Sequence, residues 1–207
     1  MKYLLLINLI LIFCACKDEN SKKYTQVKVN VNNYTSGLPI EDITCAVYEQ
    51  DAIGKNTLLK SSNTTGGIFE YSFLAKKNKS YFMTCSIDLM KYYSVSFAQY
   101  LPIEKYTLNS FEFFLTEYTY ITFDITNTNC FDSQDNFYFV RTSETGYNGY
   151  TPVTLIGCQD ILPGTYGKIP EGKWYFQWQV TKNSITTSYN DTISLLANDS
   201  IVYVLNY

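Results

Sequence analysis

Apolar and polar residues alternate along most of the chain after residue 24. Val27, Val29 and Val31 are separated by polar residues, which places the three valines on one face of a strand. Further strands are expected at residues 43–47, 68–74, 81–89 and 111–115, with turn-forming residues such as Gly66-Gly67 between them. No helical period continues for more than two turns. Short strands with regular turn signals are typical of an all-β fold and predict an antiparallel β-sandwich.

Strand signals resume at residues 118–125, directly after the segment 111–115 and without a linker. They continue at residues 137–142, 153–156, 174–180, 194–197 and 201–205, with a turn expected at 169–173. We therefore predict two tandem sandwiches, at residues 24–117 and 118–207. Because the last strand of the first runs almost directly into the first strand of the second, the pair should form a stiff rod.

The N-terminal segment has a different character. Lys2 is followed by an apolar run from Tyr3 to Cys16 that only Asn8 interrupts. Such a run is too short to cross a bilayer as a helix, and it fits the apolar region of a secretion signal. The sequence predicts a signal peptide at residues 1–15, followed by a polar, flexible tether at residues 16–23.

The end of this run, Phe13-Cys14-Ala15-Cys16, resembles the lipobox of bacterial lipoproteins, although Phe13 stands where that family usually has Leu. The resemblance implies that Cys16 becomes the first residue and carries palmitate or a similar acyl chain, which would attach the protein to a membrane. Cys16-Lys17-Asp18-Glu19 is similar to the short signal that sends some Gram-negative lipoproteins to the outer face of the outer membrane. We expect an outer-membrane, cell-surface location, with periplasm-facing anchorage as the alternative.

The first predicted sandwich also carries a resemblance. The segments Val27–Val31, Thr35–Ile40, Ala46–Tyr48 and Thr65–Phe69 look like parts of the prealbumin-like, or carboxypeptidase-regulatory-like, β-sandwich. The resemblance covers residues 24–117. It implies a fold and not an activity, because many unrelated surface proteins share this architecture.

Composition limits the chemistry that the chain can perform. Histidine is absent, the net charge is −3, and Arg141 is the single arginine among 16 basic residues. A histidine-based triad, metal site or proton shuttle is excluded, and a nucleic-acid partner is disfavoured. The sequence contains no G-x-S-x-G and no P-loop. We expect no enzymatic activity, no cofactor and no metal, and we expect the loop with Asp132 and Asp135 to be a solvated turn rather than an ion site.

Four cysteines remain after the leader, two in each predicted sandwich. This distribution favours the pairs Cys45–Cys85 and Cys130–Cys158 among three connectivities. An exported protein meets an oxidising compartment, and each bridge would be worth about 3–4 kcal/mol by loop entropy. Buried free thiols are the alternative.

The loop Gly146–Tyr150 is the most suggestive binding feature. Tyr, Asn and Gly are typical of adaptable binding loops, and a plain hairpin connection is the alternative. The candidate recognition residues are Arg141, Glu144, Tyr147, Asn148 and Tyr150.

Two further patterns have competing interpretations. Trp174 and Trp178 alternate with polar residues, which predicts a core strand; a sugar-stacking platform would need exposed rings. The segments that begin at Asp191 and Asp199 resemble the acceptor motif of bacterial surface-protein O-glycosylation. This resemblance implies modification at Thr192 and Ser200.

The leading hypothesis is a non-catalytic cell-surface lipoprotein that acts as a binding, adhesion or envelope-complex accessory module, with a polysaccharide or protein ligand. One alternative is a pilin-like subunit that assembles by strand donation, since some lipidated pilin precursors carry two prealbumin-like domains. Those precursors often mature after an N-terminal arginine, which this chain lacks. Another alternative is a periplasmic inhibitor or chaperone-like lipoprotein. The oligomeric state is left open.

Overall fold

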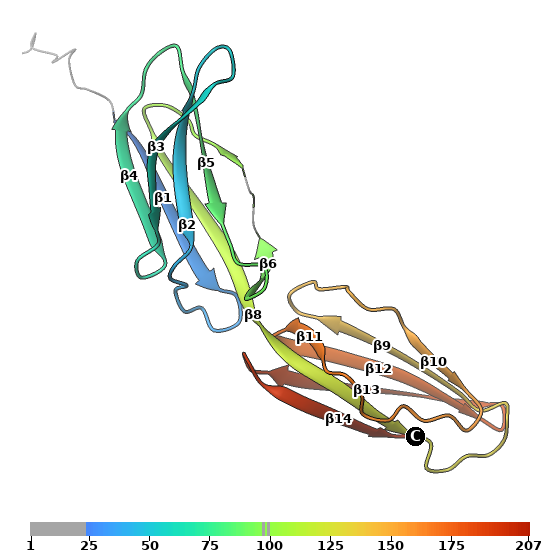
Figure 1. The fold of residues 1–207 in the computed structure, drawn as a ribbon. Coiled ribbons are helices and arrows are strands. Elements are labelled where there is room, and N and C mark those ends of the chain that lie inside the picture. Colours follow the sequence, from blue (N-terminus) through green and yellow to red (C-terminus); the bar gives the residue numbers. More distant parts are fainter. Residues whose placement is uncertain (1–23, 97, 99) are drawn as a thin grey trace, which may run out of the picture.

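The computed structural model describes residues 24–207 except 97 and 99, and strands are its only regular secondary structure (Figure 1). The predicted fold class, all-β with two tandem β-sandwiches, is confirmed. Within the described part of the chain no helix is long and apolar enough to cross a bilayer. The predicted signal peptide, tether and lipidation site at Cys16 lie outside the described residues.

The first sandwich packs two four-stranded sheets around a core of valines and aromatic residues. One sheet has the order β4 (Ile68–Leu74), β1 (Tyr24–Asn33), β8 (Leu108–Thr126) and β6 (Tyr92–Ser96). The other has the order β3 (Asn56–Asn63), β2 (Thr44–Gln50), β5 (Ser80–Ser86) and β7 (Leu101–Pro102). Val27, Val29 and Val31 are buried, as their alternation in β1 predicts.

The second sandwich shares β8 with the first. Here β8 lies between β11 (Gly167–Pro170) and β14 (Ser200–Asn206). The facing sheet has the order β10 (Val153–Ile156), β9 (Asn136–Ser143), β12 (Gly172–Lys182) and β13 (Ile185–Leu195). The core between the sheets is rich in aromatic side chains, among them Phe137, Phe139, Trp174 and Phe176, all of which are at most 1% exposed.

Two strand pairings differ from the antiparallel pattern that the sequence predicts. Both β1 and β14 lie parallel to β8, and each sheet that contains β8 is therefore mixed. Alternation within a single strand determines which face is buried but not the direction of its neighbour. These parallel pairs result from long-range connections, and local turn signals do not specify them.

Several expected boundaries are also corrected. The polar stretch at residues 61–67 also predicts a loop, but residues 61–63 belong to β3. The turn expected at 169–173 is reduced to Glu171, because β11 ends at Pro170 and β12 begins at Gly172. Most of β13 was not expected as a strand. It is an edge strand with both faces exposed over most of its length, and its sequence therefore carries no apolar stripe.

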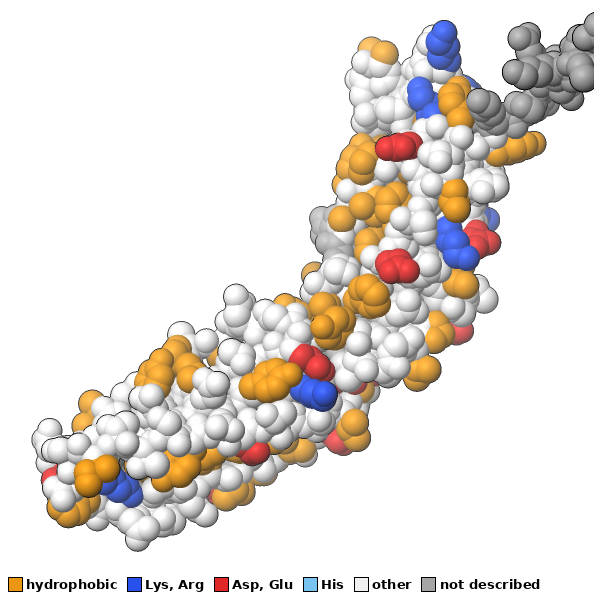
Figure 2. All heavy atoms as spheres, turned by 180° about the vertical axis from the view of Figure 1, so that it is seen from behind, with side chains coloured by type: hydrophobic (Ala, Val, Ile, Leu, Met, Phe, Trp, Pro, Cys, Tyr) orange, Lys and Arg blue, Asp and Glu red, His pale blue; other side chains and the backbone are white. Residues whose placement is uncertain are grey.

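The molecule is elongated, and the two sandwiches meet end to end at an angle (Figure 1). The 19-residue strand β8 runs without a break through residues 117 and 118, where the sequence places the domain boundary. Figure 2 shows that charged side chains on the rear face are scattered and form no large patch of one sign.

Candidate functional site

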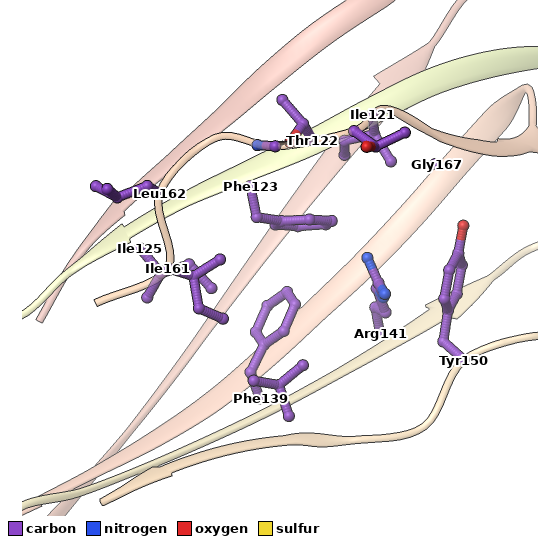
Figure 3. Close-up of a pocket in the computed structure, with 13 residues that line it drawn as sticks. Ile121, Thr122, Phe123, Ile125, Phe139, Arg141, Tyr150, Ile161, Leu162 and Gly167 are labelled. Carbon is purple, nitrogen blue, oxygen red and sulfur yellow. Dashed lines mark hydrogen bonds between the residues drawn. The ribbon is translucent and has the colours of Figure 1, made fainter. Parts of the chain in front are cut away.

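A cavity of about 300 Å³ lies within the second sandwich, between the inner faces of β8 and β9 and the segment 161–167 (Figure 3). Most of its wall is apolar and comes from Ile121, Phe123, Ile125, Phe139, Val153 and Ile161. These residues come from separate parts of the chain, and only the closure of the sandwich brings them together. A largely apolar cavity with a few polar groups is the usual form of a small-molecule site.

Arg141 is the charged group of this cavity. It follows Phe137 and Phe139 on the inward face of β9, and it occupies a position where the strand pattern would place an apolar residue. The guanidinium carbon lies 3.5 Å from the centre of the Tyr150 ring and 4.6 Å from the centre of the Phe123 ring. The guanidinium therefore lies over the faces of both aromatic rings, as in a cation–π contact.

Two polar atoms at this site have no hydrogen-bond partner in the protein. They are Nε of Arg141 and the phenol oxygen of Tyr150, and both are buried. Among the described residues, no carboxylate oxygen lies within 4 Å of the Arg141 side-chain nitrogens. Buried donors without partners are rare because leaving one unpaired costs roughly 1–3 kcal/mol.

Burial shifts the pKa of both groups. It lowers the pKa of Arg141, but an arginine remains protonated at neutral pH. Burial raises the pKa of Tyr150 to about 12, and the phenol is therefore a neutral donor at neutral pH. The cavity thus presents one positive charge, the Tyr150 hydroxyl and the threonines Thr122 and Thr165 within a largely apolar wall.

The structure divides the loop residues that the sequence grouped as one binding site. Tyr150 joins Arg141 at the cavity, and Tyr147 packs edge-on against Tyr150 and against Trp174. Asn148 is exposed, and Oε1 of Glu144 accepts a hydrogen bond from the backbone N–H of Lys173. The tyrosine rings therefore face inward, and the loop does not present all five candidates on one surface.

Sequence reasoning did not find the apolar half of the site. Ile121 and Phe123 read as ordinary core positions of an alternating strand, and residues 161–167 carried no signal beyond a loop. The one usable signal was a positive charge at an inward position of β9, because the order Phe137, Phe139, Arg141 keeps one parity.

The junction between the sandwiches is organised by Glu171, which is only 6% exposed. Its Oε1 accepts hydrogen bonds from Nδ2 of Asn33 at 2.6 Å, Oγ1 of Thr116 at 3.1 Å and the backbone N–H of Glu117 at 3.0 Å. The next residue, Gly172, has a φ of 108°, and a Cβ there would lie 2.6 Å from Oε1 of Glu144. One carboxylate therefore connects β1, β8 and the start of β12.

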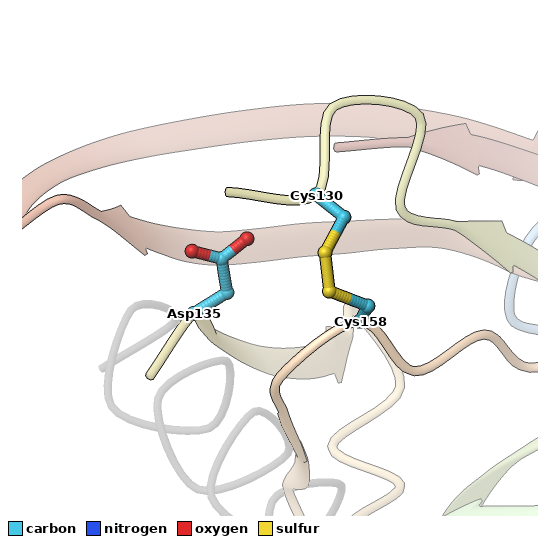
Figure 4. A group of neighbouring side chains, drawn as sticks. All are labelled: Cys130, Asp135 and Cys158. Carbon is cyan, nitrogen blue, oxygen red and sulfur yellow. A yellow bond between two sulfur atoms is a disulfide. The ribbon is translucent and has the colours of Figure 1, made fainter. Parts of the chain in front are cut away.

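Both predicted disulfides are present. Cys45 and Cys85 are directly opposite each other in β2 and β5, with Cα atoms 4.2 Å apart, and both are buried. Cys130 and Cys158 join two exposed loops, with Cα atoms 5.3 Å apart (Figure 4). Asp135 lies beside this second bridge. Since the two sulfur atoms are bonded to each other, they cannot act as thiolate ligands of a metal.

The loop that precedes β9 is only partly the solvated turn that the sequence predicts. Asp132 is exposed, but Asp135 is 1% exposed, and this part of the expectation is wrong. Oδ2 of Asp135 accepts hydrogen bonds from the backbone N–H of Phe131 at 2.9 Å and from Nδ2 of Asn127 at 3.4 Å. The buried carboxylate therefore organises the loop that carries Cys130.

The hydrogen bond from Phe131 is the main reason that the pKa of Asp135 is lowered in the folded protein. A lowered pKa means that the stabilisation is present above the unfolded pKa of about 3.9 and is lost as the pH falls through the folded value. We predict that Asp135→Asn lowers the melting temperature at pH 7 and flattens the loss of stability below about pH 4. Melting temperatures measured between pH 2 and 7 test this, with Asp132→Asn, at an exposed position of the same loop, as the control. Equal acid profiles for wild type and Asp135→Asn would contradict it.

The remaining candidates fall on the surface or in the core. Trp174 is fully buried and donates its indole N–H to the carbonyl of Pro170, which confirms the core interpretation for this residue. Trp178 is partly exposed and stacks on Tyr189, with ring centres 5.5 Å apart. Thr192 in β13 and Ser200 at the start of β14 are both exposed, and their modification stays a prediction.

Comparisons with known proteins give only distant similarities. No family model matches the chain, and no curated protein matches it. Among solved structures, it is similar to the Bacillus anthracis TIE protein (9% identity, TM-score 0.33), covering 89% of this chain and 34% of that one. A streptococcal ancillary pilin gives 13% identity and a TM-score of 0.37, covering 90% and 63%. The shaft pilin spaA from Lactobacillus rhamnosus GG gives 6% identity and a TM-score of 0.33, covering 89% and 97%. The chain spans about a third of the first and under two thirds of the second.

Proposed function

We propose that the protein is a non-catalytic, cell-surface binding module whose second sandwich carries the binding site. The position of the cavity relative to the start of β1 is the observation that supports this most directly. Strand β1 begins at Tyr24, at the end of the first sandwich that is remote from the junction, and ends at Asn33, which contacts Glu171 (Figure 1). A lipid on Cys16 would therefore place the first sandwich next to the membrane and the cavity outward.

The polar groups of the cavity are suited to binding rather than to catalysis. Arg141 remains protonated, and Tyr150, with a pKa of about 12, holds its proton at neutral pH. Neither can act as a general base near pH 7, and no carboxylate or thiol lines the described cavity. The site can therefore hold a ligand through charge, hydrogen bonds and apolar contact.

The junction supports a role in display. The hydrogen bonds of Glu171 and the continuous strand β8 connect the sandwiches by more than a flexible link. A fixed junction keeps a distal site at a constant distance from its anchor, which a Gly/Ser-rich linker would not do.

Assembly by strand addition is the second candidate function. Strand β13 is an edge of its sheet with 11 residues, and it pairs only with β12 in the described structure. Its exposed segment carries only one charged side chain, Asp191, and long edges with little charge are templates for another strand. A ladder of SDS-resistant oligomers from intact cells would support pilin-like assembly, whereas a single monomer band would exclude it.

Surface display is tested by labelling cells with radioactive palmitate and by protease treatment of intact cells. We expect label in the wild-type protein and none in a Cys16→Ser variant, and we expect the protease to remove the wild-type protein before the cells are lysed. A wild-type protein that takes up no palmitate, or that survives protease until lysis, would contradict the proposal.

A further inference from the structure

We infer that the Arg141 cavity binds a carboxylate carried on a short or medium-length apolar chain. The inference rests on the proposed function, because it names the ligand class of the site that the second sandwich would display. It follows from three features of the cavity: its unpaired charge, its apolar wall and its size.

The charge is the first feature. Arg141 is the one arginine of the chain, and it lies at an inward position of β9 with no carboxylate within 4 Å among the described residues. Its guanidinium lies over the rings of Phe123 and Tyr150, and its buried Nε has no hydrogen-bond partner. A guanidinium with an unpaired N–H is suited to a carboxylate, whose oxygens can accept in the plane of the guanidinium.

The phenol of Tyr150 adds a second donor. Its oxygen is also buried and without a partner, and it borders the same cavity. A carboxylate accepts several hydrogen bonds and donates none, and it could therefore satisfy both groups. A neutral alcohol would leave the positive charge uncompensated, and an ammonium group would be repelled.

The wall of the cavity explains the apolar part of the ligand. Beyond Arg141 the cavity continues between Phe123, Phe139, Ile125 and Ile161, with Leu162 on the covering segment (Figure 3). Burial of each methylene group contributes roughly 0.8 kcal/mol. The charged head would therefore lie at Arg141 while the chain extends toward Ile125.

The volume limits the size of the ligand. About 300 Å³ is at the lower end of the range of roughly 300–1,000 Å³ that small-molecule sites occupy. This space suits a short or medium-length chain and not a folded partner. We therefore choose octanoate as the probe.

The experiment is calorimetric titration of the purified lipidated protein in lipid nanodiscs, with empty nanodiscs as the blank. We expect saturable 1:1 binding of octanoate, and binding of 1-octanol and octylammonium at least tenfold weaker. Arg141→Gln should weaken octanoate binding at least tenfold, and Arg141→Lys, which keeps a charge without the planar fork, should weaken it less.

Tyr150→Phe is a milder test, because it removes the hydroxyl and keeps the ring over the guanidinium. We expect it to weaken octanoate binding severalfold, and we expect Tyr138→Phe, on the outer face of β9, to leave binding unchanged. Near-UV circular dichroism checks that each variant keeps its aromatic core.

Three results would overturn the inference. They are the absence of saturable octanoate binding, octanol binding as tightly as octanoate, and unchanged octanoate binding in both Arg141→Gln and Tyr150→Phe. Octyl phosphate binding tenfold tighter than octanoate would replace the carboxylate with a phosphate. These outcomes are independent of surface display, since a protein that is labelled with palmitate and removed by protease can still fail to bind octanoate.

Discussion

Replacing Glu171 with alanine is expected to lower the free energy of unfolding by about 3–5 kcal/mol and to loosen the angle between the sandwiches. The variant leaves Nδ2 of Asn33, the hydroxyl of Thr116 and the backbone N–H of Glu117 without their shared acceptor. Thr116 is fully buried, and water therefore cannot easily take the place of the carboxylate there. Chemical denaturation measures the loss of stability, and small-angle X-ray scattering measures the spread of interdomain angles.

Two further variants separate the causes of this effect. Glu171→Gln keeps an acceptor oxygen in nearly the same place but removes the charge, and we expect about half of the loss. Glu112→Ala removes an exposed carboxylate from β8, the strand that carries Thr116 and Glu117, and we expect a change within about 0.5 kcal/mol. If Glu171→Ala is as stable as Glu112→Ala and scatters like the wild type, Glu171 does not hold the junction.

Removal of the Cys45–Cys85 bridge is the second large effect. The cysteines are 40 residues apart in sequence, and a loop of this length corresponds to about 4 kcal/mol of unfolded-state entropy. Both side chains are buried in the first core. The double substitution Cys45→Ala and Cys85→Ala therefore also leaves a cavity in this core where the two sulfur atoms were. We expect the variant to unfold at a clearly lower denaturant concentration than the wild type.

The other bridge provides the matched control. Cys130 and Cys158 close a loop of similar length, with a sequence separation of 28, but both are exposed. Their double alanine variant should lose about 3–4 kcal/mol of loop entropy and little packing. The prediction fails if the Cys45–Cys85 variant is the more stable of the two.

The sequence was a good guide where the information is local. Alternating valines in residues 27–31 predicted one buried face of β1, and the same argument predicted that Trp174 lies in the core. Two cysteines in each half predicted both bridges, because the chain is much more apt to join cysteines within one folded unit. The sequence did not predict the polar edge strand β13, because exposure on both faces removes the alternation of apolar and polar residues.

The candidate site was predicted only in part. The loop composition led to Arg141 and Tyr150, which do meet at the cavity, but it also included Glu144 and Asn148, which do not line it. Glu171 was expected in a turn, but it is buried and bonds Asn33 and Thr116, which are 138 and 55 residues away along the chain. Sequence spacing does not reveal a partner at that distance.

The amino-acid sequence by itself determined that this chain forms strands, that it divides into two sandwiches and that its cysteines pair within each, because period-two alternation and cysteine placement are properties of short segments. The tertiary structure alone decided that β1 and β14 run parallel to β8, that one glutamate holds the junction and that a lone arginine faces an apolar cavity. These features arise from contacts between residues far apart in the chain, and only the closed sandwich brings those residues together.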